Sequence, residues 1–483
     1  MSEKAESFGH WTVGELPPPP RFELRQWRAM IGPGLLMAGA NIGGGEWLLG
    51  PEVTARYGGS ILWIATLAIA AQVFFNLEVM RYALYCGEPM FVGYFRLPPG
   101  PILWTGVYLA FDFIGVWPYL ASNAAVPFAA IILGRLPTEA DATLVRSLSY
   151  VVFLGAYLPV LFGRKIYNAI QLCMIVKAVL VLGYLLVINL IWNRGAWGEA
   201  FSGLFKFGML PPAMDWATVA AFAGIAGAGG LSNMQFSNYV REKGWGMGGQ
   251  VGAIPSAFGG KTIKLSHVGK VFPVTPENLD RWRGWYRHIV REQLIIWVPA
   301  VTLGAMLPAM LSLGFLPRGT TVKGWEGAAM TAKGLAEHVG PAFWYLTLTC
   351  GLLVLAPTQI TQMDGMVRRW VDVLWTGSRR LLHLDGHKVK YVYYSVLALY
   401  GVWGMIALAI LNPAQIVKTV ANFWNLALGF SAVLTVVANR RLLPKELRPR
   451  WFMELGALYC AVFYLGIFCV VAYKEFIADK ATP

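Results

Sequence analysis

A glutamate lies in the middle of the first long apolar stretch of the chain, directly after three glycines. Residues 41–47 read NIGGGEW, which places Glu46 where a membrane-spanning helix would have its centre. Glycine disfavours a helix, and a charged side chain at the bilayer centre costs roughly 2.5 to 3.5 kcal/mol on insertion scales. Backbone facing lipid must stay hydrogen-bonded, so an unwound segment at this depth needs a polar cavity beside it. The pattern predicts a bound or transported solute here.

A second glycine-rich interruption occurs in the sixth apolar stretch, where residues 223–235 read AGIAGAGGLSNMQ. It follows the first by five spans, so the second half of the chain inserts upside down relative to the first. Two interrupted spans at corresponding positions indicate an inverted-repeat transporter, with free backbone groups of both meeting near the midplane. Close helix packing would also explain spaced glycines. It does not explain Glu46 or the pair Ser232 and Asn233.

Two kinds of substrate suit these residues. A cation would be coordinated by Glu46, the amides of Asn41 and Asn233, and nearby carbonyls. An amino acid or small organic acid would instead place its carboxylate on the free amides of the glycine run, with Glu46 holding an ammonium group. Glu46 could also act only as an N-terminal cap. The candidate substrate-binding residues are Asn41, Gly43, Gly44, Gly45, Glu46, Ala228, Leu231 and Asn233, with Glu46 and Asn233 as the metal ligands.

Polar groups elsewhere in the spans are candidates for coupling or gating: Lys177, Asp112 and Gln359. Lys177 lies about 12 residues into the fifth span, which corresponds to roughly 18 Å of helix and is too deep for easy snorkelling. A buried lysine loses its proton readily, so Lys177 could carry a coupling proton. We expect Glu78 and Arg81, three residues apart on one helix face, to pair with each other.

Composition indicates an integral membrane protein. The chain has 483 residues, 56% hydrophobic and only 14% charged, whereas soluble domains are about 25% charged. We expect the net charge of +14 to reflect bases gathered on one membrane face rather than nucleic-acid binding. The five cysteines lack metal-ligand spacing and the six histidines lie in tails, loops or span ends. We therefore predict neither a cofactor nor catalytic chemistry, and the polar N-terminus predicts no cleaved signal peptide.

The apolar stretches predict an all-α protein with eleven transmembrane helices. The spans lie near 31–57, 60–84, 101–134, 148–163, 165–193, 216–241, 289–316, 338–362, 389–411, 413–438 and 452–474. The third is long enough to contain a kink at Pro118 or Pro127. The predicted organisation is a tail (1–28), a first five-helix repeat (29–193), a connection (194–215), a second repeat (216–438) with a loop at 243–285, and an eleventh helix with the C-terminus (439–483).

Basic residues alternate between loops and orient the chain in the plasma (inner) membrane, with the N-terminus cytoplasmic and the C-terminus outside. The inner loops are predicted to hold Arg21, Arg25, Arg28, Arg81, Arg96, Arg164, Lys165, Lys261, Lys264, Lys270, Arg281, Arg283, Arg287, Arg368, Arg369, Arg379, Arg380, Arg440, Arg441, Lys445, Arg448 and Arg450. Residues 259–262 read GGKT but lack the glycine and the strand of a phosphate loop. Residues 281–287 read RWRGWYR, which favours a helix lying at the lipid headgroups over a nucleic-acid site.

Short motifs resemble the Nramp (natural resistance-associated macrophage protein) family of divalent-metal transporters. They are GPGLL at 32–36, LW at 62–63, GRK at 163–165, GLL at 351–353 and TQIT at 358–361. The resemblance covers residues 30 to 440. It implies the LeuT-type fold, with helices 1 and 6 broken, and symport of manganese, iron or related ions with protons.

The site motifs depart from that family. Its Asp-Pro-Gly-Asn signature falls on residues 43–46, which read GGGE, and its Met-Pro-His-Asn signature falls on 231–234, which read LSNM. The soft methionine ligand therefore becomes Leu231 and the histidine becomes Asn233. Carboxylate and amide oxygens suit magnesium or manganese better than soft transition metals. The family's third-span acids align with Tyr119 and Ser122, so coupling by its proton route is not expected. Lys177 is instead similar to a fifth-span lysine that replaces a sodium ion in some amino-acid transporters.

Overall fold

The computed structural model describes residues 10–20, 32–162, 166–211, 214–252, 268–321, 326–378, 381, 388–410 and 413–474. These residues are almost entirely helical, as predicted. A short parallel sheet joins β1 (Thr12–Val13) to β2 (Lys270–Val271). The sequence 259–262 lies outside the described residues. So do these predicted inner-loop bases: Arg21, Arg25, Arg28, Arg164, Lys165, Lys261, Lys264, Arg379 and Arg380.

Eight described helical stretches are long and apolar enough to cross a membrane, and each coincides with a predicted span. The helices that form them are α4 (Trp63–Cys86), α8 (Ala142–Gly155) with α9 (Tyr157–Phe162), α10 (Ile166–Ile191), α14 (Pro276–Glu292) with η9 (Gln293–Trp297) and α15 (Val298–Phe315), α17 (Ala342–Gly377), α18 (Val389–Ile410), α19 (Pro413–Leu442) and α20 (Trp451–Tyr473). The chain is therefore an integral membrane protein.

The other three predicted spans are each built from shorter helices. They are α2 (Pro33–Asn41), η3 (Gly45–Leu49) and α3 (Gly50–Tyr57); α6 (Pro101–Phe113), η5 (Ile114–Val116) and α7 (Tyr119–Leu133); and α12 (Trp216–Ile225), η7 (Gly230–Met234) and α13 (Gln235–Lys243). Connecting segments carry further short helices: η4 (Gly59–Ile61), α5 (Met90–Phe95), η6 (Glu139–Asp141), α11 (Ala196–Gly203), η8 (Gly246–Gln250), α16 (Met330–His338) and η12 (Lys445–Leu447). The count of eleven spans stays a prediction.

Helical geometry stops at both glycine-rich motifs. α2 ends at Asn41, and Ile42 has a non-helical ψ of 78° before helical backbone resumes at Gly44. α12 ends at Ile225, and Gly227 and Gly229 have φ of 90° and 70° before η7 begins. Side chains other than glycine rarely adopt these positive φ angles. Gly227 and Gly229 therefore allow the chain to change direction at the second interruption.

The third predicted span is interrupted at one of the two prolines named as possible kink sites. Trp117 has extended backbone, with φ −72° and ψ 129°, and α7 begins immediately after Pro118. Proline disfavours the helical conformation in the residue that precedes it, which explains the extended Trp117. Pro127, the other predicted kink site, lies inside α7. Tyr119 therefore opens a new helix and is placed at the level of the two glycine motifs.

Two helices are longer than the sequence predicts, α17 because a buried ion pair continues it and α14 because its N-terminus is capped further upstream. α17 continues 15 residues beyond the predicted end at 362, and Asp364 pairs with Arg368 at 2.7 Å on this extension. α14 begins at Pro276, where the Thr275 hydroxyl caps the helix by accepting from the N–H of Asn278. Residues 281–287 therefore form part of a 40-residue helical stretch that continues into α15, rather than a separate surface helix.

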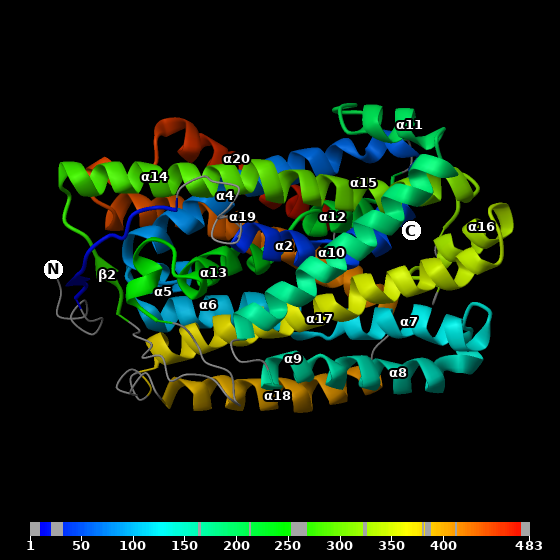
Figure 1. Cartoon of the computed structure of the whole chain (residues 1–483), viewed down its shortest axis with the longest axis horizontal. Helices are drawn as coiled ribbons and strands as arrows, with labels where there is room; N and C mark the ends of the chain where they lie inside the picture. The colour runs from blue at the N-terminus through cyan, green and yellow to red at the C-terminus, as the bar shows by residue number, and fades with distance from the viewer. Residues whose placement is uncertain are drawn as a thin grey trace.

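The long helices run roughly along the long axis of the molecule (Figure 1). The α14–α15 stretch forms one side, and α18 with α8 forms the other. α2, α12 and α13 lie between these sides, and α10 and α17 cross close to them. This arrangement encloses both interruptions in the interior of the bundle, away from its ends.

Candidate functional site

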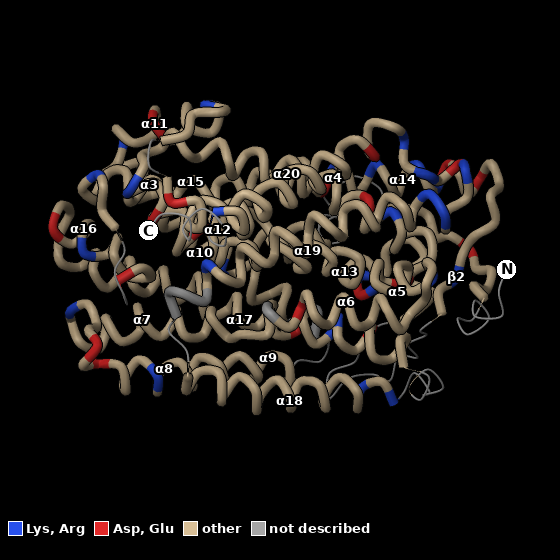
Figure 2. Tube along the Cα trace, turned by 180° about the vertical axis from the view of Figure 1, so that it is seen from behind, with Lys and Arg blue, Asp and Glu red and all other residues tan. Residues whose placement is uncertain are grey.

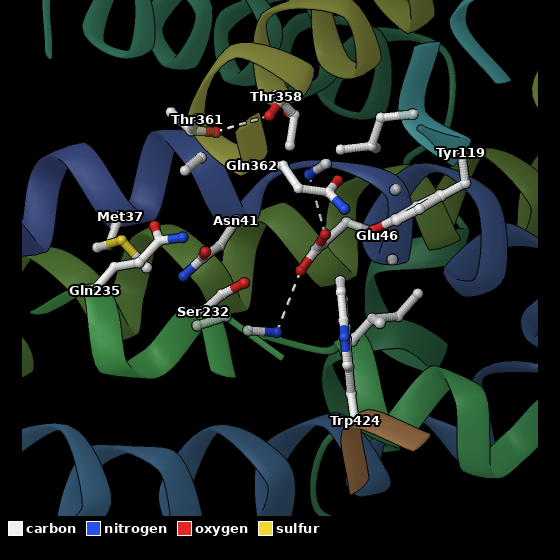
Figure 3. A pocket seen from close by; sticks show the side chains of 18 residues that line it. Met37, Asn41, Glu46, Tyr119, Ser232, Gln235, Thr358, Thr361, Gln362 and Trp424 are labelled. Carbon is white, nitrogen blue, oxygen red and sulfur yellow. Dashed lines mark hydrogen bonds between the residues drawn. The ribbon is translucent and has the colours of Figure 1, made fainter. Parts of the chain in front are cut away.

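A cavity of about 50 Å³ lies where the two interrupted segments meet (Figure 3). Backbone around Gly43 and Gly227 forms part of its wall, and α7, α13, α17 and α19 complete it. The polar side chains that line it are Asn41, Glu46, Tyr119, Ser232, Gln235, Thr358, Thr361 and Gln362. The interior of the bundle therefore contains a polar space at the position where the sequence predicts one.

The Glu46 carboxylate bonds the backbone of both interruptions. Its Oε2 accepts from the N–H of Gly43 at 3.0 Å, and its Oε1 accepts from the N–H of Gly227 at 3.2 Å. The side chain is only 1% exposed. An ionised carboxylate has about four acceptor positions, so these two bonds leave capacity for a ligand. Glu46 can therefore cap the backbone and face a substrate at the same time.

The amide of Gln72 on α4 satisfies the backbone of the second interruption. Its Nε2 donates to the carbonyl of Ala226 at 2.6 Å, and its Oε1 accepts from the N–H of Ala228 at 2.8 Å. Tyr464 on α20 also lies 2.6 Å from Gln72 Nε2. Backbone groups released from a helix inside a membrane need such partners, because no bulk water is available there. Gln72 and Glu46 together bond three consecutive residues of this interruption.

The two segments approach each other closely enough to require glycine. A Cβ atom added to Gly45 would lie 2.6 Å from the carbonyl oxygen of Ile225. A Cβ on Gly43 would lie 2.9 Å from Thr358 on α17. Both distances are well inside van der Waals contact. The glycine run therefore brings the first interruption against both the second interruption and α17.

Two side-chain atoms at the cavity have no hydrogen-bond partner among the described residues. They are Nδ2 of Asn41, a donor, and Oε1 of Gln362, an acceptor. Both residues are at least nine-tenths buried, and Figure 3 shows their side chains beside Glu46 and Ser232. A buried polar atom without a partner costs about 1–3 kcal/mol, so these atoms indicate a place for water or a ligand.

Lys177 lies behind the cavity wall. Its ammonium donates to the Thr358 hydroxyl, which in turn donates to the carbonyl of Val354 at 2.6 Å. Lys177 is 2% exposed and is not a lining residue, whereas Thr358 is. A buried lysine amine therefore lies one side chain away from the cavity.

The structure divides the predicted site residues into two groups. Those that line the cavity are Asn41, Gly43, Gly44, Gly45, Glu46 and Ala228. Those that do not are Leu231, Asn233, Lys177, Asp112 and Gln359. Asn233 is fully buried and donates to the carbonyl of Gly230 at 3.3 Å. In the second segment Ser232 and Gln235 line the cavity, on either side of the predicted metal ligand.

Two coupling candidates are already bonded to neighbouring helices. Asp112 pairs with Arg369 at 2.8 Å and accepts from Trp370 at 2.9 Å. Gln359 accepts from the N–H of Ala121 at 3.2 Å and donates to the Tyr400 hydroxyl at 3.0 Å. Both side chains thus tie α17 to its neighbours. The predicted pairing of Glu78 with Arg81 is confirmed, at 2.9 Å.

Sequence reasoning missed several residues at this site. Gln235, Thr361, Gln362 and Trp424 line the cavity, and Gln72 holds its backbone. A single uncharged polar residue within an apolar span was the only available signal for Gln72. Thr361 and Gln362 follow the TQ pair at 358–359 by one helical turn, so they share its face of α17. That spacing could have identified them.

Comparison with known proteins supports the fold. No family model matches the chain, and no curated protein matches it. A solved manganese transporter of Eremococcus coleocola superposes with a TM-score of 0.66 at 12% identity, over 98% of this chain and 93% of that one. A nucleobase-cation-symport-1 family transporter, solved in a closed conformation with bromovinylhydantoin, gives 0.51 at 13% identity over 92% and 93%. The chain therefore has the fold of the LeuT-type transporters.

Proposed function

We propose that this protein is a secondary-active transporter of the Nramp type that carries a hard divalent cation, such as magnesium or manganese, through the cavity at Glu46. The observation that supports this most strongly is the bonding of one carboxylate to both interruptions. A cation bound there would contact both interrupted segments, α2–α3 and α12–α13. Movement of one segment would then change the site, as alternating access requires.

The chemistry of the lining favours a hard cation. Glu46 supplies the charge, and hydroxyl and amide groups such as those of Ser232 and Gln362 supply neutral oxygens. Such oxygens suit magnesium, calcium and manganese. The Met37 thioether also lines the cavity, but no lining residue is a histidine or cysteine. Nor does any described group of three or more histidine, cysteine, aspartate or glutamate side chains have the geometry for a metal. An ion that keeps part of its water shell fits this donor set best.

The size of the cavity agrees with a small substrate. Its volume of about 50 Å³ is several times the space of roughly 10–15 Å³ that a single water requires on a comparable scale. An ion with a few waters fits that volume. The solved relative named a manganese transporter shares the fold, which is consistent with this proposal.

The alternative is a proton-coupled transporter of an amino acid or small organic acid. The unpartnered donor of Asn41 and the aromatic wall of Trp424 favour an organic solute. The backbone N–H groups of Gly43 and Gly227 weigh against an organic acid, because both already donate to Glu46. A substrate carboxylate would have to displace the Glu46 carboxylate to use them. We therefore place the cation first.

The architecture proposed for this function is two inverted five-helix repeats, 29–193 and 216–438, plus an eleventh helix. The interruptions at Ile42–Gly43 and 226–229 then belong to the first and sixth spans. The N-terminus would face the cytoplasm and the C-terminus the outside of the plasma (inner) membrane. This orientation places the α14 end of the molecule inside.

Uptake into proteoliposomes tests the function directly. We expect saturable uptake of magnesium or manganese and weak competition by cadmium, because the lining is rich in oxygen donors. Protein-free liposomes supply the background. A mixed pool of labelled amino acids is offered in parallel vesicles. Uptake of an amino acid without any metal flux would establish the alternative and exclude the cation proposal.

We propose that Lys177 makes transport depend on pH. A divalent ion about 7 Å from a charged lysine would be repelled by roughly 5 kcal/mol at an effective dielectric near 20. Ion binding should therefore favour neutral Lys177. The titratable groups near Lys177 are the Glu46 carboxyl and the Cys350 thiol, of which the thiol is uncharged at neutral pH.

The expected result is a wild-type affinity for the cation that rises with pH, because a rising pH removes the opposing charge. Lys177→Met should transport with an affinity that rises less steeply with pH than in wild type, because only protonation of the Glu46 carboxylate then remains to oppose the ion. Lys333→Met, an exposed lysine on α16, is the matched control and should behave as wild type. An unchanged pH profile in Lys177→Met would remove Lys177 from coupling.

A further inference from the structure

We propose that the exposed face of α14, with the neighbouring turn between α19 and α20, binds the phosphate of an anionic phospholipid. Arg283 and Arg287 are exposed and four residues apart, so they lie on the same helix face. Neither forms an ion pair with a carboxylate in the described part of the chain. Arg291 continues the row at the same spacing and is also exposed. The face therefore presents a column of guanidinium groups.

The change in side-chain polarity along this helix places the column at the membrane surface. Leu294 and Ile295 are 52% and 62% exposed, and they are the first large apolar side chains on the exposed face. Arg287 lies roughly 10 Å before Leu294, at 1.5 Å per residue. The headgroup layer on each side of the hydrocarbon is about 5–7 Å thick. Arg291, three residues or roughly 4.5 Å before Leu294, lies within that layer, and the flexible stems of Arg287 and Arg283 extend the column outward from it.

The α19–α20 turn supplies a second basic surface beside α14. Arg81 joins the two, because its guanidinium lies 4.2 Å from the Tyr286 ring on α14 and donates to the Leu447 carbonyl at 3.0 Å. Trp451, 73% exposed, begins the apolar part of α20, as a tryptophan at a lipid–water boundary commonly does. The exposed bases of the turn are Lys445, Arg448 and Arg450.

At the opposite end of the molecule, three arginines form ion pairs with carboxylates. There Arg56 pairs with Asp215 at 3.2 Å, Arg135 with Asp141 at 2.7 Å and Arg318 with Glu199 at 2.5 Å. Figure 2 shows red and blue segments at both ends, with several blue segments gathered along α14. The exposed acids closest in sequence to the column and the turn are Asp280 and Glu446. Arg283 and Arg287 thus differ from these three arginines in having no carboxylate partner in the described part of the chain.

The chemistry of the column matches a lipid phosphate. Guanidinium groups bind phosphate through paired N–H donors, with geometry that an ammonium lacks. An anionic leaflet also attracts bases at its surface. A nucleic acid would not reach a face that continues directly into lipid-exposed Leu294. An anionic phospholipid both carries a phosphate and lies at the membrane surface, so we assign it as the occupant.

The test measures the thermal stability of the detergent-solubilised, full-length protein during titration with short-chain phosphatidylglycerol. Phosphatidylcholine of the same chain length and inorganic phosphate are titrated in parallel. The variant is Arg283→Gln with Arg287→Gln. The matched control is Arg146→Gln with Lys333→Gln, two exposed bases on α8 and α16 at the other end.

We expect phosphatidylglycerol to stabilise wild type and control at the same concentration. In the α14 variant, the phosphatidylglycerol concentration that gives half of the maximal stabilisation should rise about 25-fold. Each lost arginine contributes about fivefold, and the two factors multiply. Phosphatidylcholine should have little effect. Equal responses of wild type and the α14 variant would overturn the proposal. Stabilisation by inorganic phosphate at matched concentration would also overturn it, because the site would then recognise the free anion. Neither outcome depends on the transport activity.

Discussion

Replacing Glu46 with glutamine is expected to reduce cation uptake close to the background of protein-free liposomes. The change removes the only carboxylate in the cavity lining and leaves an amide of nearly the same shape. Loss of a charged partner from a buried site costs about 3 kcal/mol, which weakens apparent affinity roughly 100-fold. The new NH₂ group also faces an N–H of Gly43 or Gly227, so one interruption loses its acceptor. Uptake of manganese over a concentration series measures the effect.

Two further variants separate loss of the site from loss of the fold. Glu46→Asp keeps the charge on a shorter side chain, so it should retain uptake with reduced affinity. Glu337→Gln makes the same chemical change at an exposed position on α16 and should transport as wild type. All three proteins should elute as single species from size exclusion. Wild-type affinity in Glu46→Gln would show that the cation binds elsewhere.

Gln72→Leu is expected to destabilise the protein by about 2–4 kcal/mol and to abolish transport, because two buried backbone groups lose their partners. The Ala226 carbonyl and the Ala228 N–H both bond to this one amide. Leucine fills a similar volume but offers neither donor nor acceptor. Water in the cavity could restore only part of the bonding. Equilibrium unfolding in mixed micelles, together with uptake, measures both consequences.

Substitutions of residues that contact Gln72 should destabilise the protein by smaller amounts. Tyr464→Phe removes the third partner of Gln72 and leaves both backbone bonds, so the free energy of unfolding should fall by about 1 kcal/mol or less. Gly227→Ala should cost about 1–2 kcal/mol or more, because φ is 90° and the new Cβ would lie 2.8 Å from Gln72 Oε1. Gly183→Ala, where a Cβ meets nothing within 4 Å, is its matched control and should not destabilise. Equal stability of Gln72→Leu and Tyr464→Phe would contradict the role given to Gln72.

The sequence allowed the membrane class and most helix positions to be predicted, because both depend on local properties. The length of the apolar segments was enough to locate the eight membrane-length helices among the described residues. The end of α17 could not be predicted from that property. Asp364 and Arg368 look like the start of a loop, and only their burial as an ion pair keeps them in the bundle. The kink at Pro118 was predictable because proline restricts the residue before it, here Trp117.

The candidate site was predicted in part, because only some of its residues belong to a local sequence pattern. A carboxylate among glycines is improbable in a lipid-facing helix, so Glu46 was identified without a structure. The residues from the second segment depend on the helical register after Gly230, which sequence does not fix. Ser232 and Gln235 therefore line the cavity where Asn233 was expected. Gln72 acts through a contact 154 residues away in the chain, and no local pattern reveals such a contact.

The central claim is that a cation binds at the meeting point of the two interruptions. Anomalous scattering from crystals grown with manganese tests it most directly, because the signal locates the metal itself. We predict a peak in the cavity, about 2.1 Å from a carboxylate oxygen of Glu46 as expected for a small hard ion. Protein from the same preparation must show uptake. Crystals of transporting protein with manganese bound elsewhere, and none beside Glu46, would contradict the claim.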